Sequence, residues 1–236
     1  MIISIFNFKG GVGKSTTAAN LSAALATKKR KVLVIDLDAQ RTLSFALGIE
    51  GKEPNVIDWL NGSRNAIETS RPNLYAIAGS FDILRHQISE GLIAESLKGL
   101  IEYDVIVLDC PPAINAMSVE AILSCDRLII PIVSEPAVIK GLAEAVELVR
   151  EESSDLPIDV LRSRYRSRLV ITKEYDAMLT SGADDLGFNL LKTSIPENVV
   201  IAEAVSSQVS VLDYSKNSIG AKAFRKLAKE IINAKV

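Results

Sequence analysis

A glycine-rich segment with two lysines lies near the N-terminus, directly after a short apolar run. Residues 9–16 read Lys-Gly-Gly-Val-Gly-Lys-Ser-Thr. Glycines let successive backbone N–H groups turn inward around phosphate oxygens, and a helix that begins near Lys14 adds its positive end. We therefore predict a phosphate-binding loop whose contacts come from these residues: Gly10, Gly11, Val12, Gly13, Lys14, Ser15 and Thr16.

The segment departs from the general phosphate-loop pattern, Gly-x-x-x-x-Gly-Lys-[Ser/Thr], at one position. Gly13, Lys14 and Ser15 match its second half, whereas Phe8 stands where the first glycine belongs. Lys14 would still neutralise charge on the β- and γ-phosphates, and the Ser15 hydroxyl would bind Mg²⁺. A glycine-rich turn with surface lysines is the alternative, and it does not account for the Ser-Thr pair that follows a strand.

Carboxylates stand at the ends of two further apolar runs. Asp36 ends the run 31–36 and Asp38 follows it, while Asp109 ends the run 104–109. Side chains beyond the carboxyl ends of parallel strands meet at the ligand-binding edge of such a sheet. These aspartates are therefore candidates for Mg²⁺ and water chemistry, and capping of a turn or helix is the alternative.

Apolar runs alternate with helix-like segments along the whole chain. Runs that are apolar on both faces indicate buried parallel strands, with helices covering both faces of the sheet. We predict an α/β fold, a doubly wound and mostly parallel sheet of the P-loop NTPase type, in one domain over 1–236. Strands are expected at 2–6, 31–36, 104–109, 127–133 and 168–172. Helices are expected at 15–29, 83–101, 117–124, 138–151 and 219–234, and a surface excursion at 51–80.

Composition, charge and cysteine content exclude several classes of protein. The 236 residues are 48% hydrophobic and 24% charged, and the formal net charge is −2. The molecule is not a polycation, so any nucleic-acid binding must come from a local patch. Two cysteines, Cys110 and Cys125, form neither a disulfide framework nor a zinc pattern. With no signal peptide or long apolar span, we expect a cytoplasmic protein.

Several segments together resemble the deviant Walker A ATPases, the family that includes the ParA partition proteins and MinD. The resemblance rests on residues 9–16, 36–40, 107–112, 195–199 and 203–206, which occur in the family's order over nearly the whole chain. It implies ATP and Mg²⁺ as cofactors and an ATPase that acts as a dimer. It points most closely to ParA-type proteins without an N-terminal DNA-binding domain, because the chain begins at the first expected strand.

The resemblance also implies roles for matching residues. Lys9 corresponds to the signature lysine, which reaches the nucleotide of a partner subunit. Asp38 corresponds to the aspartate that orients the attacking water, and Asp109 to the Walker B aspartate that holds a water of the Mg²⁺ shell. Asp36 would support Mg²⁺ through water. A solvated lysine and capping carboxylates are the respective alternatives.

The segment 195–198 resembles the part of the family that lines the adenine. Pro196 would pack on the base and Asn198 would hydrogen-bond its edge, unless the segment is a plain exit from a strand. Many partition ATPases have an arginine after this proline, whereas this chain has Glu197. A DNA contact by an arginine at that position is therefore not expected.

Two basic segments are candidates for DNA phosphates. Residues 162–168 alternate arginine with other types, so in an extended chain the four arginines would share one face. The stretch 216–236 holds six lysines and arginines, Lys235 among them, against the single acid Glu230. The proposed patch consists of Arg162, Arg164, Arg166, Arg168, Lys222, Arg225, Lys226 and Lys229. A solvated helix face is the alternative.

The last expected helix carries apolar residues at helical spacing, namely Phe224, Leu227, Ala228 and Ile231. Such a face docks on the sheet or lies on a membrane surface, as in MinD. We expect docking on the sheet, and no membrane binding.

These observations favour a ParA-like ATPase that closes as a homodimer over two ATP molecules and binds DNA non-specifically. We expect it to be nucleoid-associated when ATP-bound. A ParB-like or other cargo-adaptor protein would stimulate its slow hydrolysis, and a plasmid, chromosome or other large cargo would be positioned. One alternative is a MinD-like regulator at a membrane. Another is a metabolic enzyme on the same scaffold, such as a dethiobiotin-synthetase-like ligase or a nitrogenase-iron-protein-like reductase.

Overall fold

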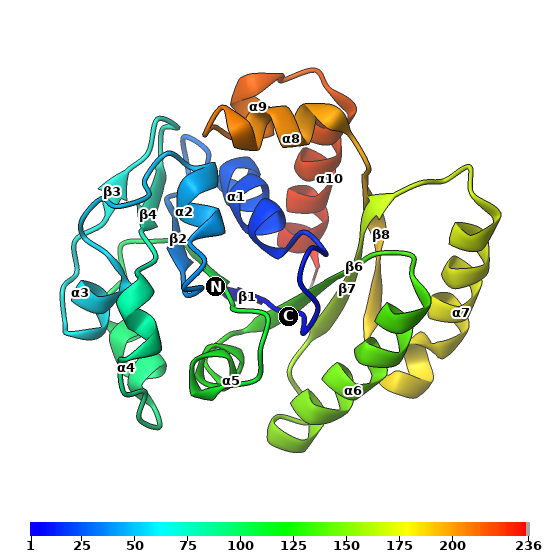
Figure 1. The fold of residues 1–236 in the computed structure, drawn as a ribbon, viewed down its shortest axis with the longest axis horizontal. Helices are drawn as coiled ribbons and strands as arrows, with labels where there is room; N and C mark the ends of the chain where they lie inside the picture. The colour runs from blue at the N-terminus through cyan, green and yellow to red at the C-terminus, as the bar shows by residue number, and fades with distance from the viewer. Residues whose placement is uncertain (235–236) are drawn as a thin grey trace.

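An eight-stranded sheet forms the centre of the molecule (Figure 1). The computed structural model describes residues 1–234, and for residues 136–140 it describes the backbone alone. The strand order is β3-β4-β2-β5-β1-β6-β7-β8, and every neighbouring pair is parallel except β3 with β4. The strands are β1 (Ile2–Ile5), β2 (Val32–Asp36), β3 (Ile67–Glu68), β4 (Leu74–Ile77), β5 (Val105–Asp109), β6 (Arg127–Ile132), β7 (Ile158–Tyr165) and β8 (Asn189–Pro196).

Helices cover both faces of the sheet, which confirms the predicted α/β class. Two separate apolar cores lie on the two faces. The first face carries α1 (Lys14–Leu25), α2 (Thr42–Ala46), α8 (Val199–Ser206), α9 (Val211–Tyr214) and α10 (Ile219–Asn233). The second carries α3 (Val56–Leu60), α4 (Leu92–Lys98), α5 (Ala116–Leu123), α6 (Pro136–Glu152) and α7 (Val170–Leu186), with a short 3₁₀ turn, η1, at Phe81–Leu84.

The pairing of β1, β2 and β5 determines where the site lies. Strand β5 sits between β1 and β2, with Asp109 aligned to Ile5 on one side and to Asp36 on the other. The glycine-rich segment leaves β1 at the same edge and leads into α1. Three segments far apart in the sequence therefore meet at the carboxyl edge of three adjacent strands.

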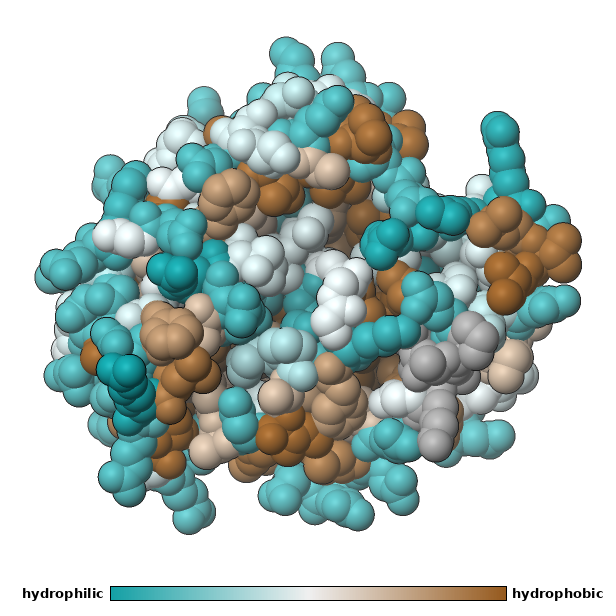
Figure 2. All heavy atoms as spheres, viewed as in Figure 1, coloured by the Kyte–Doolittle hydropathy of each residue, from teal (hydrophilic) through white to brown (hydrophobic). Residues whose placement is uncertain are grey.

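The prediction of a strand at 168–172 is wrong. The chain there turns into α7, and the strands on either side of that helix in the sequence are β7 and β8. Leu169, Val170 and Ile171 looked like a buried run, yet all three are exposed. Figure 2 shows brown side chains gathered where Figure 1 places the connection from β7 to α7.

The segment 51–80 is not a surface excursion. It contains α3 and β4, and β4 pairs with β2 inside the sheet. Trp59 is fully buried in the second core, and its ring N–H donates to the carbonyl of Ser96 at 3.3 Å. The long helix expected at 83–101 is shorter, because only Leu92–Lys98 forms α4.

The C-terminal helix docks on the sheet, as expected. Phe224, Leu227, Ala228 and Ile231 are all buried against β8 and α1. Lys235 lies outside the described residues. Within residues 1–234, no helix combines the length and apolar character needed to cross a bilayer.

Candidate functional site

The predicted phosphate loop joins β1 to α1 and takes a conformation that requires glycine. Gly11 and Gly13 have φ angles of 76° and 93°, in the left-handed region that side chains other than glycine rarely adopt. A Cβ built on Gly10 or Gly11 would meet no atom within 4 Å, so the space over the loop is open. Phe8 turns away, because its ring packs edge-on against Phe6 at 5.0 Å between centroids.

Lys14 is a buried cation at the centre of this loop. Its side chain curls back, so that Nζ donates to the carbonyl of Lys9 at 3.1 Å. Burial lowers the pKa of Lys14, and the nearby carboxyls of Asp109 and Asp38 oppose that shift. A buried cation among backbone dipoles, next to open space over the loop, can bind an anionic ligand such as a phosphate chain.

Asp109 is fully buried at the end of β5, and neither of its oxygens has a hydrogen-bond partner among the described residues. Burial, followed by the charge of Asp36, raises its pKa well above the usual value. A buried carboxylate without partners is costly unless a ligand satisfies it. This orphaned acceptor beside the Ser15–Lys14 turn is what a hydrated Mg²⁺ ion requires.

Asp36 has the opposite character, because the protein itself satisfies its oxygens. One oxygen accepts from the Ser44 amide at 2.9 Å and from the Ser44 hydroxyl at 2.6 Å, and the other accepts from the Asp38 amide at 3.1 Å. Burial raises its pKa to about 6 even so. The two predicted aspartates at the sheet edge therefore differ. Among the described residues the Asp109 carboxylate has no hydrogen-bond partner, whereas the Asp36 carboxylate accepts three hydrogen bonds.

Asp38 lies in the loop between β2 and α2, where its carboxylate accepts from the Gln40 amide at 2.9 Å. It faces a cavity of about 880 Å³ that runs over the phosphate loop. The cavity lining comes from five places along the chain. It includes Gly10, Gly11, Gly13, Lys14, Ser15, Thr16, Asp38, Gln40, Thr42, Pro112, Ser163, Arg164, Pro196, Glu197, Asn198 and Ile201.

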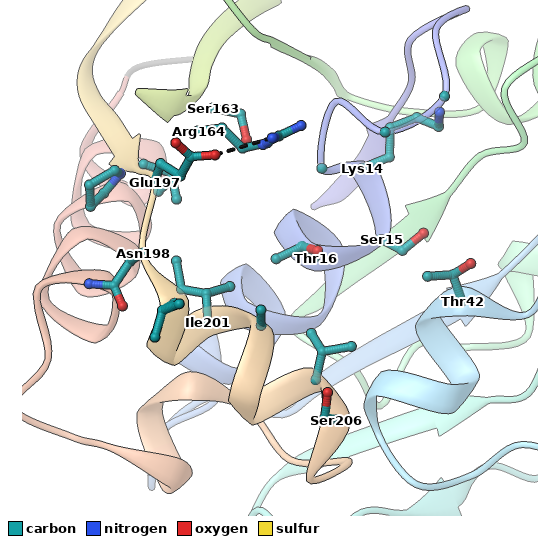
Figure 3. A pocket seen from close by; sticks show the side chains of 18 of the residues that line it. Lys14, Ser15, Thr16, Thr42, Ser163, Arg164, Glu197, Asn198, Ile201 and Ser206 are labelled. Carbon is teal, nitrogen blue, oxygen red and sulfur yellow. Dashed lines mark hydrogen bonds and ion pairs between the residues drawn. The ribbon is translucent and has the colours of Figure 1, made fainter. Parts of the chain in front are cut away.

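The far wall of the cavity is built by the end of β8 and the start of α8 (Figure 3). Pro196 and Asn198 line it, as the sequence suggested. The side-chain oxygen Oδ1 of Asn198 accepts from the Val200 amide at 2.8 Å and thereby caps α8. That leaves the amide NH₂ as the group available to a base edge.

Gln40, Thr42, Ser163 and Arg164 are among the lining residues that sequence analysis did not assign to the nucleotide site. Ser163 approaches the loop so closely that a Cβ on Gly13 would lie 2.8 Å from its hydroxyl oxygen. Arg164 has a φ of 47° and projects over the cavity (Figure 3). Only the arginine run around residue 164 drew attention to this strand end.

Lys9 does not line the cavity of its own chain. Its ammonium instead pairs with Glu135 at 2.7 Å, and both side chains are substantially exposed. The Lys9 contact lowers the pKa of Glu135. The cation is therefore on the surface next to the cavity mouth, held by an exposed ion pair of small energetic value.

The four arginines of 162–168 do not share one face. Strand β7 ends at Tyr165, and the left-handed Arg164 breaks the alternation. Arg162 pairs with Asp176 of α7 at 3.4 Å, whereas Arg164 and Arg166 both pair with Glu197. One carboxylate thus offsets part of the charge of two arginines, and the predicted continuous patch is divided.

The basic residues of α10 remain together. Lys222, Arg225, Lys226 and Lys229 are exposed along the helix, opposite the face that packs on the sheet. Glu230 is turned away from them, since its carboxylate accepts from the Lys192 and Thr193 amides of β8 at 2.6 and 2.9 Å. The surface of α10 is therefore purely cationic over these four positions.

The fold and the loop geometry define the class as P-loop nucleotide-binding proteins. A family model described as an AAA domain matches residues 1–158. The chain is 31% identical to the chromosome-partitioning ATPase Soj of Treponema pallidum, over 96% of this chain and 94% of the relative. It is also 31% identical to the sporulation initiation inhibitor Soj of Bacillus subtilis, over 98% and 97%.

Among solved structures, the septum site-determining protein MinD of Pyrococcus horikoshii, complexed with Mg-ADP, is similar with a TM-score of 0.83 and 30% identity. The match covers 100% of this chain and 99% of that one. This chain therefore belongs to the ParA, Soj and MinD family of deviant Walker A ATPases, and it is an ATPase.

Proposed function

We propose that the chain binds ATP with Mg²⁺, closes as a dimer over two nucleotides, binds DNA non-specifically and positions a plasmid, chromosome or other large cargo. The observation that carries the ATP site is the single cavity in which the phosphate loop, Asp38 and the wall at Pro196 and Asn198 face one another. Its volume of about 880 Å³ accommodates a nucleotide. Relatives named for chromosome partitioning support the cellular role.

Each side chain has a task in this scheme. The loop amides and Lys14 bind the phosphates, Ser15 and Asp109 hold Mg²⁺, the latter through a water, and Asp38 orients the attacking water. Mg²⁺, when bound, supplies positive charge against the phosphates. Pro196 and Asn198 contact the adenine. With no strong general base among the cavity-lining residues described, hydrolysis rests on positioning and is slow until a partner protein stimulates it.

Lys9 completes the site of the partner subunit. It stands at the cavity mouth, outside its own cavity, and its ammonium is paired with the exposed Glu135. A second cation placed against the phosphates of a partner would offset charge that grows in the transition state. Dimer closure would thereby be coupled to the presence of the γ-phosphate.

DNA binding is assigned to α10. Its four exposed cations lie in a row along the helix. Glu230, the acid next to Lys226, has its carboxylate bonded to backbone amides of β8, whereas Arg164 and Arg166 share Glu197. Lysines and arginines in such a row neutralise DNA phosphates without reading sequence, and the affinity then falls steeply with salt. The ATP-bound dimer would present two such helices. This is why we expect it to associate with the nucleoid.

Reversing the charge of Arg225 and Lys226 to glutamate tests this assignment. The variant should lose about 10-fold or more in affinity for non-specific duplex DNA, with a shallower dependence on salt, because each lost phosphate contact lowers the salt slope by about one. Fluorescence anisotropy at several salt concentrations measures both quantities, in the presence of ATP and Mg²⁺.

Lys52→Glu with Lys98→Glu is the matched control, because it makes the same change in net charge at exposed sites away from α10. It should bind DNA nearly as the unaltered chain does. Equal losses in the two variants would show that only net charge matters, and unchanged binding in the α10 variant would place the DNA surface elsewhere.

A further inference from the structure

Asp36 is the centre of a buried hydrogen-bond network that the catalytic scheme leaves unused. Its carboxylate is fully buried, and it accepts three hydrogen bonds, from the Asp38 amide and from the amide and hydroxyl of Ser44. Ser44 is also fully buried, and its hydroxyl oxygen accepts from the Gly79 amide at 2.8 Å. Three chain segments, the ends of β2 and β4 and the helix α2, are joined in this way.

Hydrogen bonds of this network fix both ends of the loop that carries Asp38. The Asp38 amide lies at the near end, two residues after Asp36, and Ser44 lies at the far end, in the first turn of α2. Helix α2 has no side-chain cap of its own, because the side chain of Arg41 at the N-cap position makes no capping hydrogen bond. Asp36 therefore serves as a remote cap, which satisfies an amide that would otherwise be unpaired.

The space around Asp36 leaves little freedom. A Cβ on Gly79 would lie 2.9 Å from the Asp36 carboxyl carbon, so the chain at residue 79 packs directly on the carboxylate. Side chains locked by packing and hydrogen bonds are what hold a catalytic group within a fraction of an ångström. Asp38 and Gln40, which lie on the tied loop, both face the cavity.

We propose that Asp36 and Ser44 are positioning residues for hydrolysis, which fix the loop that presents Asp38 to the attacking water. This inference rests on the proposed role of Asp38 and replaces the expectation that Asp36 supports Mg²⁺. Asp109, whose oxygens lack a hydrogen-bond partner among the described residues, is the carboxylate that would serve the ion. Asp36 has its lone pairs directed at Ser44 and Asp38, and it acts on the reaction through them.

The test compares Ser44→Ala, Asp36→Asn and Asp38→Ala in steady-state ATP turnover, ATP binding and Mg²⁺ titration. Ser44→Ala removes one donor to Asp36 and the acceptor for Gly79 but keeps the Ser44 amide bond, so it is the variant expected to stay folded. We expect kcat to fall by about 10- to 100-fold, because small misplacements of a catalytic group have effects of that size. KM, ATP affinity and the midpoint of the Mg²⁺ titration should stay within about twofold of their starting values.

The double variant Ser44→Ala with Asp38→Ala separates positioning from a merely structural role. If Ser44 acts through Asp38, the double variant should turn over no more slowly than Asp38→Ala alone, because residues that act as a unit are not additive. A further loss of similar size would overturn the proposal, as would unchanged kcat in Ser44→Ala.

Asp36→Asn decides between positioning and Mg²⁺ support. A lower kcat that persists at saturating Mg²⁺ supports positioning, whereas a shift of the Mg²⁺ midpoint by about 10-fold with kcat restored at high Mg²⁺ returns Asp36 to the metal. Failure of the underlying scheme looks different, because normal turnover by Asp38→Ala would remove the water-orienting role itself.

Discussion

Lys14 shows how much of a residue's chemistry is set by its surroundings. The side chain is almost completely buried, and burial opposes its charge, while Asp109 and Asp38 support it. Its ammonium donates a hydrogen bond to the loop carbonyl of Lys9. Phosphate oxygens would give this ammonium stronger, charge-assisted partners than a single carbonyl does.

Replacing Lys14 by alanine should therefore abolish tight nucleotide binding. A hydrogen bond to a charged group contributes about 1.5–3 kcal/mol, so the affinity for ATP should fall by at least about 10-fold. Isothermal titration calorimetry with ATP and Mg²⁺ measures this, with circular dichroism to verify folding. Lys28→Ala, which changes an exposed lysine, is the control and should bind normally.

Retention of tight ATP binding by Lys14→Ala would contradict the assignment of the phosphate loop. Loss of binding in both variants would instead point to an effect of charge in general.

At the scale of elements, the strands that carry the loop and the aspartates were predictable, because β1, β2, β5 and β6 are apolar on both faces. Strand β7 was not, because Asp159 interrupts its apolar run. Asp159 is nevertheless buried, since Arg127 of the neighbouring β6 pairs with it at 2.9 Å. A polar pair buried across two strands can place a charged residue inside an otherwise apolar run, as Asp159 does in β7.

The same limit applies to the site. Residues 9–16 and Asp109 were recognisable from their types and spacing at strand ends. Ser163 and Arg164 reach the cavity only because β7 and the loop meet in space, which no local pattern indicates. The hydrogen bond from the Ser44 hydroxyl to Asp36, eight residues earlier, likewise depends on the packing of α2.

Because α10 docks on the sheet, we predict that substitutions on its buried face lower the free energy of unfolding more than substitutions at its exposed positions. Phe224 is fully buried against the sheet, so Phe224→Ala should lower the free energy of unfolding by about 3–5 kcal/mol. Ile219 is 57% exposed at the start of the same helix, and Ile219→Ala should cost less than about 0.5 kcal/mol. Urea unfolding followed by circular dichroism measures both, and equal midpoints would contradict docking.

For the whole molecule, the distribution of charge suggests a switch. The chain carries a formal net charge of −2, yet Lys9 stands beside the cavity mouth and four exposed cations lie in a row along α10. Lys9 at the mouth lies outside its own cavity, and in the proposed dimer it would add a cation to the partner's site, beside Lys14 and Arg164 there. ATP binding, dimer closure and DNA binding would then form one coupled event.

The most direct test of this account is the mass of Asp38→Ala in solution with bound nucleotide, measured by light scattering. Asp38→Ala should bind ATP without consuming it, so the closed state accumulates. The account predicts a dimer with ATP and Mg²⁺ and a monomer with ADP. It also predicts that Lys9→Ala in the same background binds ATP but stays monomeric. The same mass with ATP and ADP, or full dimerisation without Lys9, would contradict it.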